Sequence, residues 1–172
     1  MPVTFRQLQR GDFSILAEWL ALPHVAPWWS DEPTVSALEE SYGPVVDGTD
    51  PTDAFIVELD GRPVGFVQRY RIEDYPQWCT ALGIDRAAGI DYLIGVASLT
   101  GVGLGPIIVE SITTMTFERY ADIDRMAVAV QQANHRSWRA LEKAGYNRVF
   151  EGMIESTDPS DAGPSYVYVR AR

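Results

Sequence analysis

The spacing of hydrophobic and polar residues predicts strands and helices in irregular alternation. Val3 to Leu8 alternates apolar and polar side chains, which is typical of a strand with one buried face. A helix ending at Pro23 is predicted next, because apolar residues recur at helical spacing: Phe13, Leu16, Ala17 and Leu20. A loop over 24–33 should lead into a second helix over 34–42, ended by Gly43-Pro44.

Two strands joined by a tight turn are predicted in the next stretch. Ala54 to Leu59 and Val64 to Tyr70 flank Asp60-Gly61, a dipeptide typical of two-residue hairpin turns. The polar and aromatic segment from Glu73 to Ala88 is predicted to be irregular. Gly89 to Gly95 is mostly apolar and predicts a buried strand.

The rest of the chain predicts two further helices and three strands. A glycine-rich turn over 100–105 precedes a helix whose apolar stripe is Leu104, Ile107, Ile108, Ile112 and Met115. The other predicted elements are a strand at Met126 to Val130, a helix from Asn134 to Ala144 with Asn134 as N-cap and Gly145 as its C-terminal glycine, and strands at Tyr146 to Phe150 and Tyr166 to Arg170. This order predicts an α/β fold, of the α+β mixed-sheet kind, in a single domain over residues 1–172.

Composition narrows the class of protein. The 172 residues are 46% hydrophobic, and 24 acidic against 14 basic side chains give a net charge of −10. This charge argues against nucleic acid or an anionic membrane as partner and suits a cationic one. With one cysteine, Cys79, and two histidines, neither a disulfide nor a Cys- or His-rich metal site is expected. No secretory signal and no apolar run near ~18 residues is visible, so we expect a cytoplasmic protein.

The strongest local motif is the glycine-rich turn from Thr100 to Gly105. Three glycines between a strand and a helix let the backbone approach a ligand, and the first amides of the helix form an anion site. The glycine spacing matches neither the dinucleotide fingerprint nor a P-loop. The alternative is a glycine-rich turn that binds no ligand.

This turn resembles the Q/R-x-x-G-x-G/A pyrophosphate loop of the GNAT N-acetyltransferases, which use acetyl-CoA and need no metal. Gly103 and Gly105 match, whereas Thr100 stands where the family has Gln or Arg. A second family block is similar to the helix that opens at Asn134 and closes on Leu141-Glu142-Lys143-Ala144-Gly145-Tyr146. The resemblance implies a central, mostly antiparallel sheet flanked by helices.

Other blocks resemble the aminoglycoside 6′-N-acetyltransferases more specifically: His24-Val25-Ala26-Pro27-Trp28-Trp29, Tyr42, Val64 to Tyr70, and Gly89-Ile90-Asp91. The resemblance implies acetylation of the 6′-amine of aminoglycoside antibiotics, and hence resistance, by direct transfer in a ternary complex. Related siderophore-type acyltransferases share these blocks, so a siderophore-type or other small-amine N-acyltransferase is the alternative. A non-catalytic CoA-binding module is the rival from another class.

Asp91 is the candidate catalytic residue. A carboxylate in an apolar strand is costly to bury without a partner, and as a base it could take a proton from a substrate ammonium. In the resembled family the matching Asp has this role. The alternative is an acid held by an arginine such as Arg86, or by loop amides.

The resemblance also implies the substrate-binding residues. It places Trp29, Tyr42 and Gln68 in the substrate pocket, with Trp29 as a wall of the cleft. The alternative for Trp29 is a satellite hydrophobic cluster, and for Tyr42 and Gln68 it is core packing or a hairpin hydrogen bond. Acids and aromatics suited to ammonium groups and sugar faces gather in one segment: Glu73, Asp74, Tyr75, Trp78 and Asp85. Of these we predict that Asp74 and Trp78 bind substrate, unless the segment is simply a solvated loop.

A C-terminal acid completes the predicted substrate site. Asp158 and Asp161 precede Gly163-Pro164, where the family supplies an amine-binding acid, and we take Asp161. A further family acid aligns with Ala129 and is absent.

The resemblance implies that acetyl-CoA contacts the end of one strand, the glycine turn and the last helix: Ile94, Val96, Gly101, Val102, Gly103, Leu104, Gly105 and Asn134. A backbone N–H of the Asp91 strand would stabilise the oxyanion. Leu141 replaces the tyrosine that in much of the family protonates the thiolate, so the thiolate would leave unprotonated or take a proton from water. Cys79 has no obvious activating base and is expected to be inert.

Overall fold

The computed structural model describes residues 2–172 and divides into two compact units. The first unit contains residues 2–68 and 91–100, and the second contains residues 69–90 and 101–172. Two strands, β3 and β4, contribute residues to both units.

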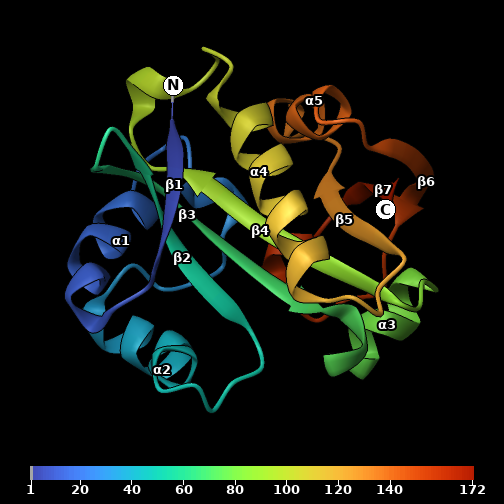
Figure 1. Ribbon diagram of the computed structural model, residues 1–172, viewed down its shortest axis with the longest axis horizontal. Helices are drawn as coiled ribbons and strands as arrows, with labels where there is room; N and C mark the ends of the chain where they lie inside the picture. The colour runs from blue at the N-terminus through green and yellow to red at the C-terminus, as the bar shows by residue number, and fades with distance from the viewer. Residues whose placement is uncertain (1) are drawn as a thin grey trace. The chain divides into compact units, whose positions relative to one another are not determined.

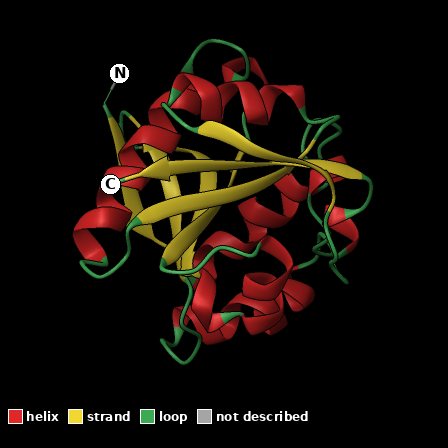
Figure 2. Ribbon diagram, turned by 90° about the vertical axis from the view of Figure 1, so that its right-hand side faces the viewer, coloured by secondary structure: helices red, strands yellow, loops and turns green. Residues whose placement is uncertain are grey.

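Seven strands within residues 2–172 form one mixed sheet in the order β1-β2-β3-β4-β5-β7-β6. The strands are β1 (Val3–Gln7), β2 (Asp53–Leu59), β3 (Arg62–Arg71), β4 (Ala87–Ile94), β5 (Arg125–Gln131), β6 (Asn147–Met153) and β7 (Pro164–Ala171). β4 and β5 are parallel, whereas β1 with β2, β5 with β7 and β6 with β7 are antiparallel. Figure 2 shows the same elements by type, with strands in yellow and helices in red. The predicted mixed α/β sheet is confirmed.

The first unit is built around one hydrophobic cluster. Its helices α1 (Phe13–Leu20) and α2 (Val35–Val46) lie beside β1 and β2 (Figure 1). The cluster joins side chains from both helices and from three strands: Leu8, Phe13, Leu16, Trp19, Leu20, Val25, Leu38, Tyr42, Ala54, Ile56, Phe66 and Leu93. The predicted apolar face of the first helix is therefore the one that is buried.

The predicted end of the second helix at Gly43-Pro44 is wrong. Pro44 lies inside α2, which continues to Val46. Val45 and Val46 pack against the core cluster, and the amides of Thr49 and Asp50 both donate to the Pro44 carbonyl. Burial of the last turn therefore outweighs the one helical hydrogen bond that proline removes.

The predicted hairpin between β2 and β3 is confirmed. Asp60 and Gly61 have φ angles of 51° and 74°. Positive φ at both central residues is the geometry that a two-residue turn needs to match the strand twist.

The second unit contains a helix that the sequence analysis missed. Residues 73–88 are not irregular throughout: α3 spans Pro76–Leu82, and β4 begins at Ala87, two residues before the predicted strand. Pro76 occupies the first turn of α3, and Gly83 ends it with a φ of 63°. The helix is stable here because Trp78, Cys79 and Leu82 pack on a small core that includes Ile72, Ala87 and Ala127.

The two long helices of the second unit follow the prediction closely. α4 spans Leu104–Arg119 and α5 spans His135–Lys143. A Cβ at Gly105 would lie 3.3 Å from the Cβ of Ala140, so α4 and α5 approach closely at this point. The Asn134 side chain accepts from the Ser137 amide as the predicted N-cap, and Gly145 has a φ of 82° after the helix.

A buried tyrosine in this unit gives the fold a predictable response to alkali. The Tyr146 hydroxyl lies 2.5 Å from the Thr113 hydroxyl, and burial raises the pKa of Tyr146 from 10.0 to about 12. The folded state then holds this proton more tightly than the unfolded chain, so its contribution to stability is complete below pH 10 and is lost as the pH rises through 12.

We expect Tyr146→Phe to flatten this loss. Between pH 9 and pH 11.5 the wild-type protein should lose about 2 kcal/mol of unfolding free energy more than the variant does. Urea unfolding at the two pH values measures the difference. Parallel losses in the two proteins would contradict the assignment.

None of the helices in residues 2–172 is long and apolar enough to cross a membrane.

Candidate active site

Asp91 is paired with a side chain from the neighbouring strand of the first unit. It lies on β4, is half-buried, and its Oδ2 accepts a hydrogen bond of 2.8 Å from Nε2 of Gln68 on β3. The pair therefore brings together two residues predicted separately, one as base and one as substrate contact.

Three aromatic rings of the first unit pack together. Trp29 and Tyr42 both meet Phe66 edge-on, with ring centroids 5.7 and 5.4 Å from it. Tyr42 is buried and its hydroxyl donates to Asp31 at 3.3 Å. Both side chains therefore have a packing role, which was the alternative for each, and Trp29 is only half-buried.

The end of β4 is fixed by three hydrogen bonds that the sequence alone does not indicate. Nε2 of His24 lies 2.9 Å from the carbonyl oxygen of Ile94, and the amide of Gly95 donates to Val64 at 2.8 Å. The amide of Val96 also points to Val64, at 3.4 Å. In the sequence, His24 was indicated only as the first residue of a block that resembles the family. That block gave no indication that His24 contacts Ile94.

In the second unit, the glycine turn has the backbone that only glycine adopts readily. Gly101 and Gly103 have φ angles of 79° and 93°, and a Cβ at either position would meet no atom within 4 Å. These glycines are therefore required by conformation and not by crowding. Gly105 is different, because it faces Ala140.

The turn has the features of an anion site. It is exposed, and it leads directly into α4, a helix of 16 residues whose first amides lack helical acceptors. Val102 is 57% exposed, whereas the Leu104 side chain is fully buried, so any ligand contact of Leu104 is through its main chain. Asn134 uses its side-chain oxygen to cap α5.

The remaining predicted substrate residues of the second unit lie in or near α3. Asp74 is exposed in a short turn of 3-10 helix at Ile72–Asp74, and Trp78 is half-buried on α3. Tyr75 meets Tyr70 edge-on at 5.3 Å. Glu73 accepts the main-chain amide of Arg86 at 2.9 Å, so this acid has a local structural role.

The two C-terminal acids have distinct environments. Asp158 accepts the amide and hydroxyl of Ser160 and so caps a short turn. Asp161 accepts from the Ser156 hydroxyl at 2.6 Å, and burial raises the pKa of this carboxyl above its ordinary value.

Contacts describe three further residues of the second unit. The Arg86 guanidinium binds Asp124 at 2.6 Å and keeps the pKa of that acid below its ordinary value. Leu141 is fully buried, so it is a core residue of α5. Cys79 lies on α3 with its Sγ 3.6 Å from the carbonyl of Ile84.

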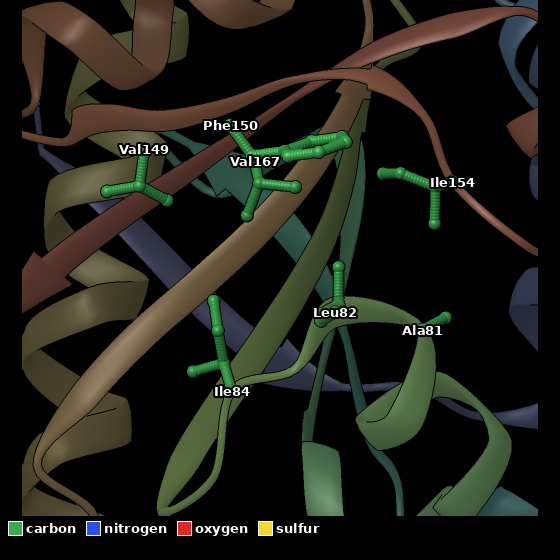
Figure 3. A pocket seen from close by; sticks show the side chains of 7 residues that line it. All are labelled: Ala81, Leu82, Ile84, Val149, Phe150, Ile154 and Val167. Atoms are coloured by element: carbon green, nitrogen blue, oxygen red, sulfur yellow. The ribbon is translucent and has the colours of Figure 1, made fainter.

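A hollow elsewhere in the second unit contains none of these residues. It has a volume of about 280 Å³ and is lined by apolar side chains from the end of α3, β6, β7 and their neighbours (Figure 3). Within residues 2–172, no group of three or more His, Cys, Asp or Glu side chains could hold a metal ion.

Comparison with known proteins identifies the family. A family model described as "Acetyltransferase (GNAT) domain" matches residues 9–154. The chain belongs to the GNAT acetyltransferases. Among GNAT proteins, aminoglycoside N(6′)-acetyltransferase type 1 of Klebsiella pneumoniae is 30% identical over 174 residues, covering 99% of this chain and 83% of that protein.

Solved GNAT structures agree with this assignment. AAC(6′)-Ib in complex with paromomycin and acetyl-CoA has a TM-score of 0.79 at 28% identity, covering 100% of this chain and 94% of that one. AAC(6′)-Ib with coenzyme A and kanamycin gives the same TM-score at 29% identity, covering 99% and 95%. The predicted family and the predicted GNAT fold are confirmed.

Proposed function

We propose that this protein is an acetyl-CoA-dependent aminoglycoside 6′-N-acetyltransferase, formed by a single domain over residues 1–172 and acting in the cytoplasm. The observation that supports it most is the hydrogen-bonded Asp91–Gln68 pair, within a chain that resembles AAC(6′)-Ib along its whole length. Gln68 is two residues along β3 from Phe66, which contacts the Trp29 and Tyr42 rings.

Asp91 is the base of this proposal. An aminoglycoside amine is an ammonium ion at neutral pH and has no lone pair for attack until it loses a proton. The carboxylate of Asp91 would accept that proton, and the neutral amine would attack the thioester carbonyl. The C–N bond would form as the C–S bond to CoA breaks, and CoA would leave as a thiolate. The proton acceptor is thus a side chain that the neighbouring strand already holds by a hydrogen bond.

A CoA ligand would contact the chain at three places. The main-chain amides over 101–105 would bind the pyrophosphate, because the turn is exposed, has two glycines with left-handed φ, and leads into the first amides of α4. Ile94 and Val96 would pair with the pantetheine arm, and Asn134 would contribute at the start of α5. Acetyl-CoA supplies an acyl thioester, and a β4 main-chain N–H would stabilise the charge on its oxygen.

Carboxylates and rings would hold the rest of the aminoglycoside. Asp74 and Asp161 would pair with ammonium groups, and Trp29 and Trp78 would cover sugar faces. The buried Tyr42 would support the site through its contact with Phe66. The net charge of −10 favours such a polycation. Because Leu141 is buried and apolar, the thiolate would take its proton from water.

A thiol-release assay tests this function. With acetyl-CoA and kanamycin, tobramycin or sisomicin, we expect release of the free thiol of CoA, and we expect KM for the aminoglycoside to rise with salt. The absence of release with all three compounds would exclude the aminoglycoside substrate.

The glycine turn gives a separate prediction. Gly103→Val should raise KM for acetyl-CoA roughly tenfold or more, because a β-branched residue at a φ of 93° costs about 1–3 kcal/mol and distorts the turn. Initial rates at varied acetyl-CoA measure the change. Gly48→Val is the matched control: Gly48 has a φ of 73° outside the site and should leave KM unchanged. Equal effects of both substitutions would argue against a CoA contact at the turn.

A further inference from the structure

The contact between Gln68 and Asp91 is set by the register of two strands. β3 and β4 are neighbours in the sheet. The hydrogen bond from the Gly95 amide to the Val64 carbonyl places Gly95 opposite Val64. Moving along both strands in opposite directions brings Phe66 opposite Leu93 and then Gln68 opposite Asp91. Cross-strand neighbours of this kind lie on one face of the sheet and interact directly.

The surroundings in the first unit limit how the pair can move. Phe66 and Leu93, one step along, are both buried in the core cluster, and the Trp29 and Tyr42 rings rest on Phe66. At Gly65, a Cβ would run into the carbonyl oxygen of Leu93, so the two strands are in close backbone contact there. Gln68 therefore extends from a rigid support.

From this arrangement we infer that Gln68 is a positioning residue that acts through Asp91, and not mainly a substrate contact. This inference rests on the proposed function of Asp91 as base. The Gln68 amide donates one N–H to Oδ2, which fixes the orientation of the carboxylate. Correct orientation of a reacting group affects turnover, and a misplacement of about 1 Å can cost roughly 10²-fold.

The two roles predict different kinetics. If Gln68 positions Asp91, Gln68→Ala should lower kcat roughly tenfold to hundredfold and leave KM for kanamycin within about twofold. If Gln68 mainly binds the sugar, KM should rise and kcat should be nearly unchanged. Gln68→Glu is the isosteric test: it places a second carboxylate beside Asp91 and should lower kcat at least as much as Gln68→Ala.

A double-mutant cycle decides the question, using kcat/KM of the full-length protein with kanamycin. Gln68→Ala, Asp91→Ala and the double variant are compared with wild type, and melting temperatures check that each is folded. We expect the double variant to be no slower than Asp91→Ala alone, because Gln68 has no further role once its partner is gone. If kcat/KM of the double variant falls below that of Asp91→Ala by the same factor that Gln68→Ala costs in the wild-type protein, the inference is overturned.

The controls separate this inference from the proposed function. Gln7→Ala alters an exposed glutamine on β1 and should match wild type. If wild-type protein releases no CoA thiol with kanamycin, the proposed function fails. If wild-type protein releases the thiol and the double variant loses kcat/KM by the product of the two single losses, only the role of Gln68 is overturned. Should Gln68→Ala be unfolded, Gln68→Glu takes its place in the cycle, with the same two outcomes.

Discussion

Asp91→Asn should lower kcat/KM for kanamycin by about 10²- to 10⁴-fold, the range that general acid–base groups contribute. The asparagine keeps the size of the side chain and can still accept from Gln68, but it cannot take the proton of the ammonium ion. KM for acetyl-CoA should be nearly unchanged. Steady-state rates with each substrate varied in turn measure both effects.

Asp60→Asn is the control for this variant. Asp60 lies in the β2–β3 turn with a φ of 51°, which asparagine tolerates, so turnover should equal that of wild type. An Asp91→Asn protein that retains near-wild-type turnover would show that Asp91 is not the base.

Gly65→Ala should destabilise the protein by about 1–3 kcal/mol, which is a large share of a typical unfolding free energy of 5–15 kcal/mol. The added Cβ would overlap the backbone carbonyl of Leu93, and backbone cannot rotate away as a flexible side chain can. β3 and β4 would have to separate where they hold Gln68 and Asp91. Thermal unfolding should show a Tm lower by about 3–10 °C.

Gly11→Ala is the matched control for the same chemical change. A Cβ at Gly11 would meet no atom within 4 Å, so its Tm should stay close to that of wild type. If Gly65→Ala also leaves Tm unchanged, β3 and β4 do not approach as closely at Gly65 as the structure shows.

The fold was largely predictable from the sequence because its local signals agree with its tertiary contacts. The turn at Asp60-Gly61 and the cap at Asn134 are each specified by a residue type that the backbone geometry requires. The errors arose where packing outweighs a local signal. Val46 keeps α2 helical beyond Pro44, and Trp78 stabilises α3 through core contacts made far from it in sequence.

The candidate site was predictable as a set of residues but not as a set of contacts. The resemblance indicated Gln68 and Asp91, yet only strand register places them 2.8 Å apart. Likewise, Gly103 and Gly105 belong to one motif but serve different purposes, one for a left-handed backbone and one for helix packing. The bond between His24 and Ile94 joins residues distant in sequence and has no local signal.

The most direct test of the central claim is the structure of the product by NMR after wild-type protein is incubated with acetyl-CoA and kanamycin. We predict one new acetamide, on the 6′-nitrogen, and none when the substrate is an aminoglycoside with a hydroxyl in place of the 6′-amine. An acetyl group on another nitrogen, or unchanged kanamycin, would contradict the account.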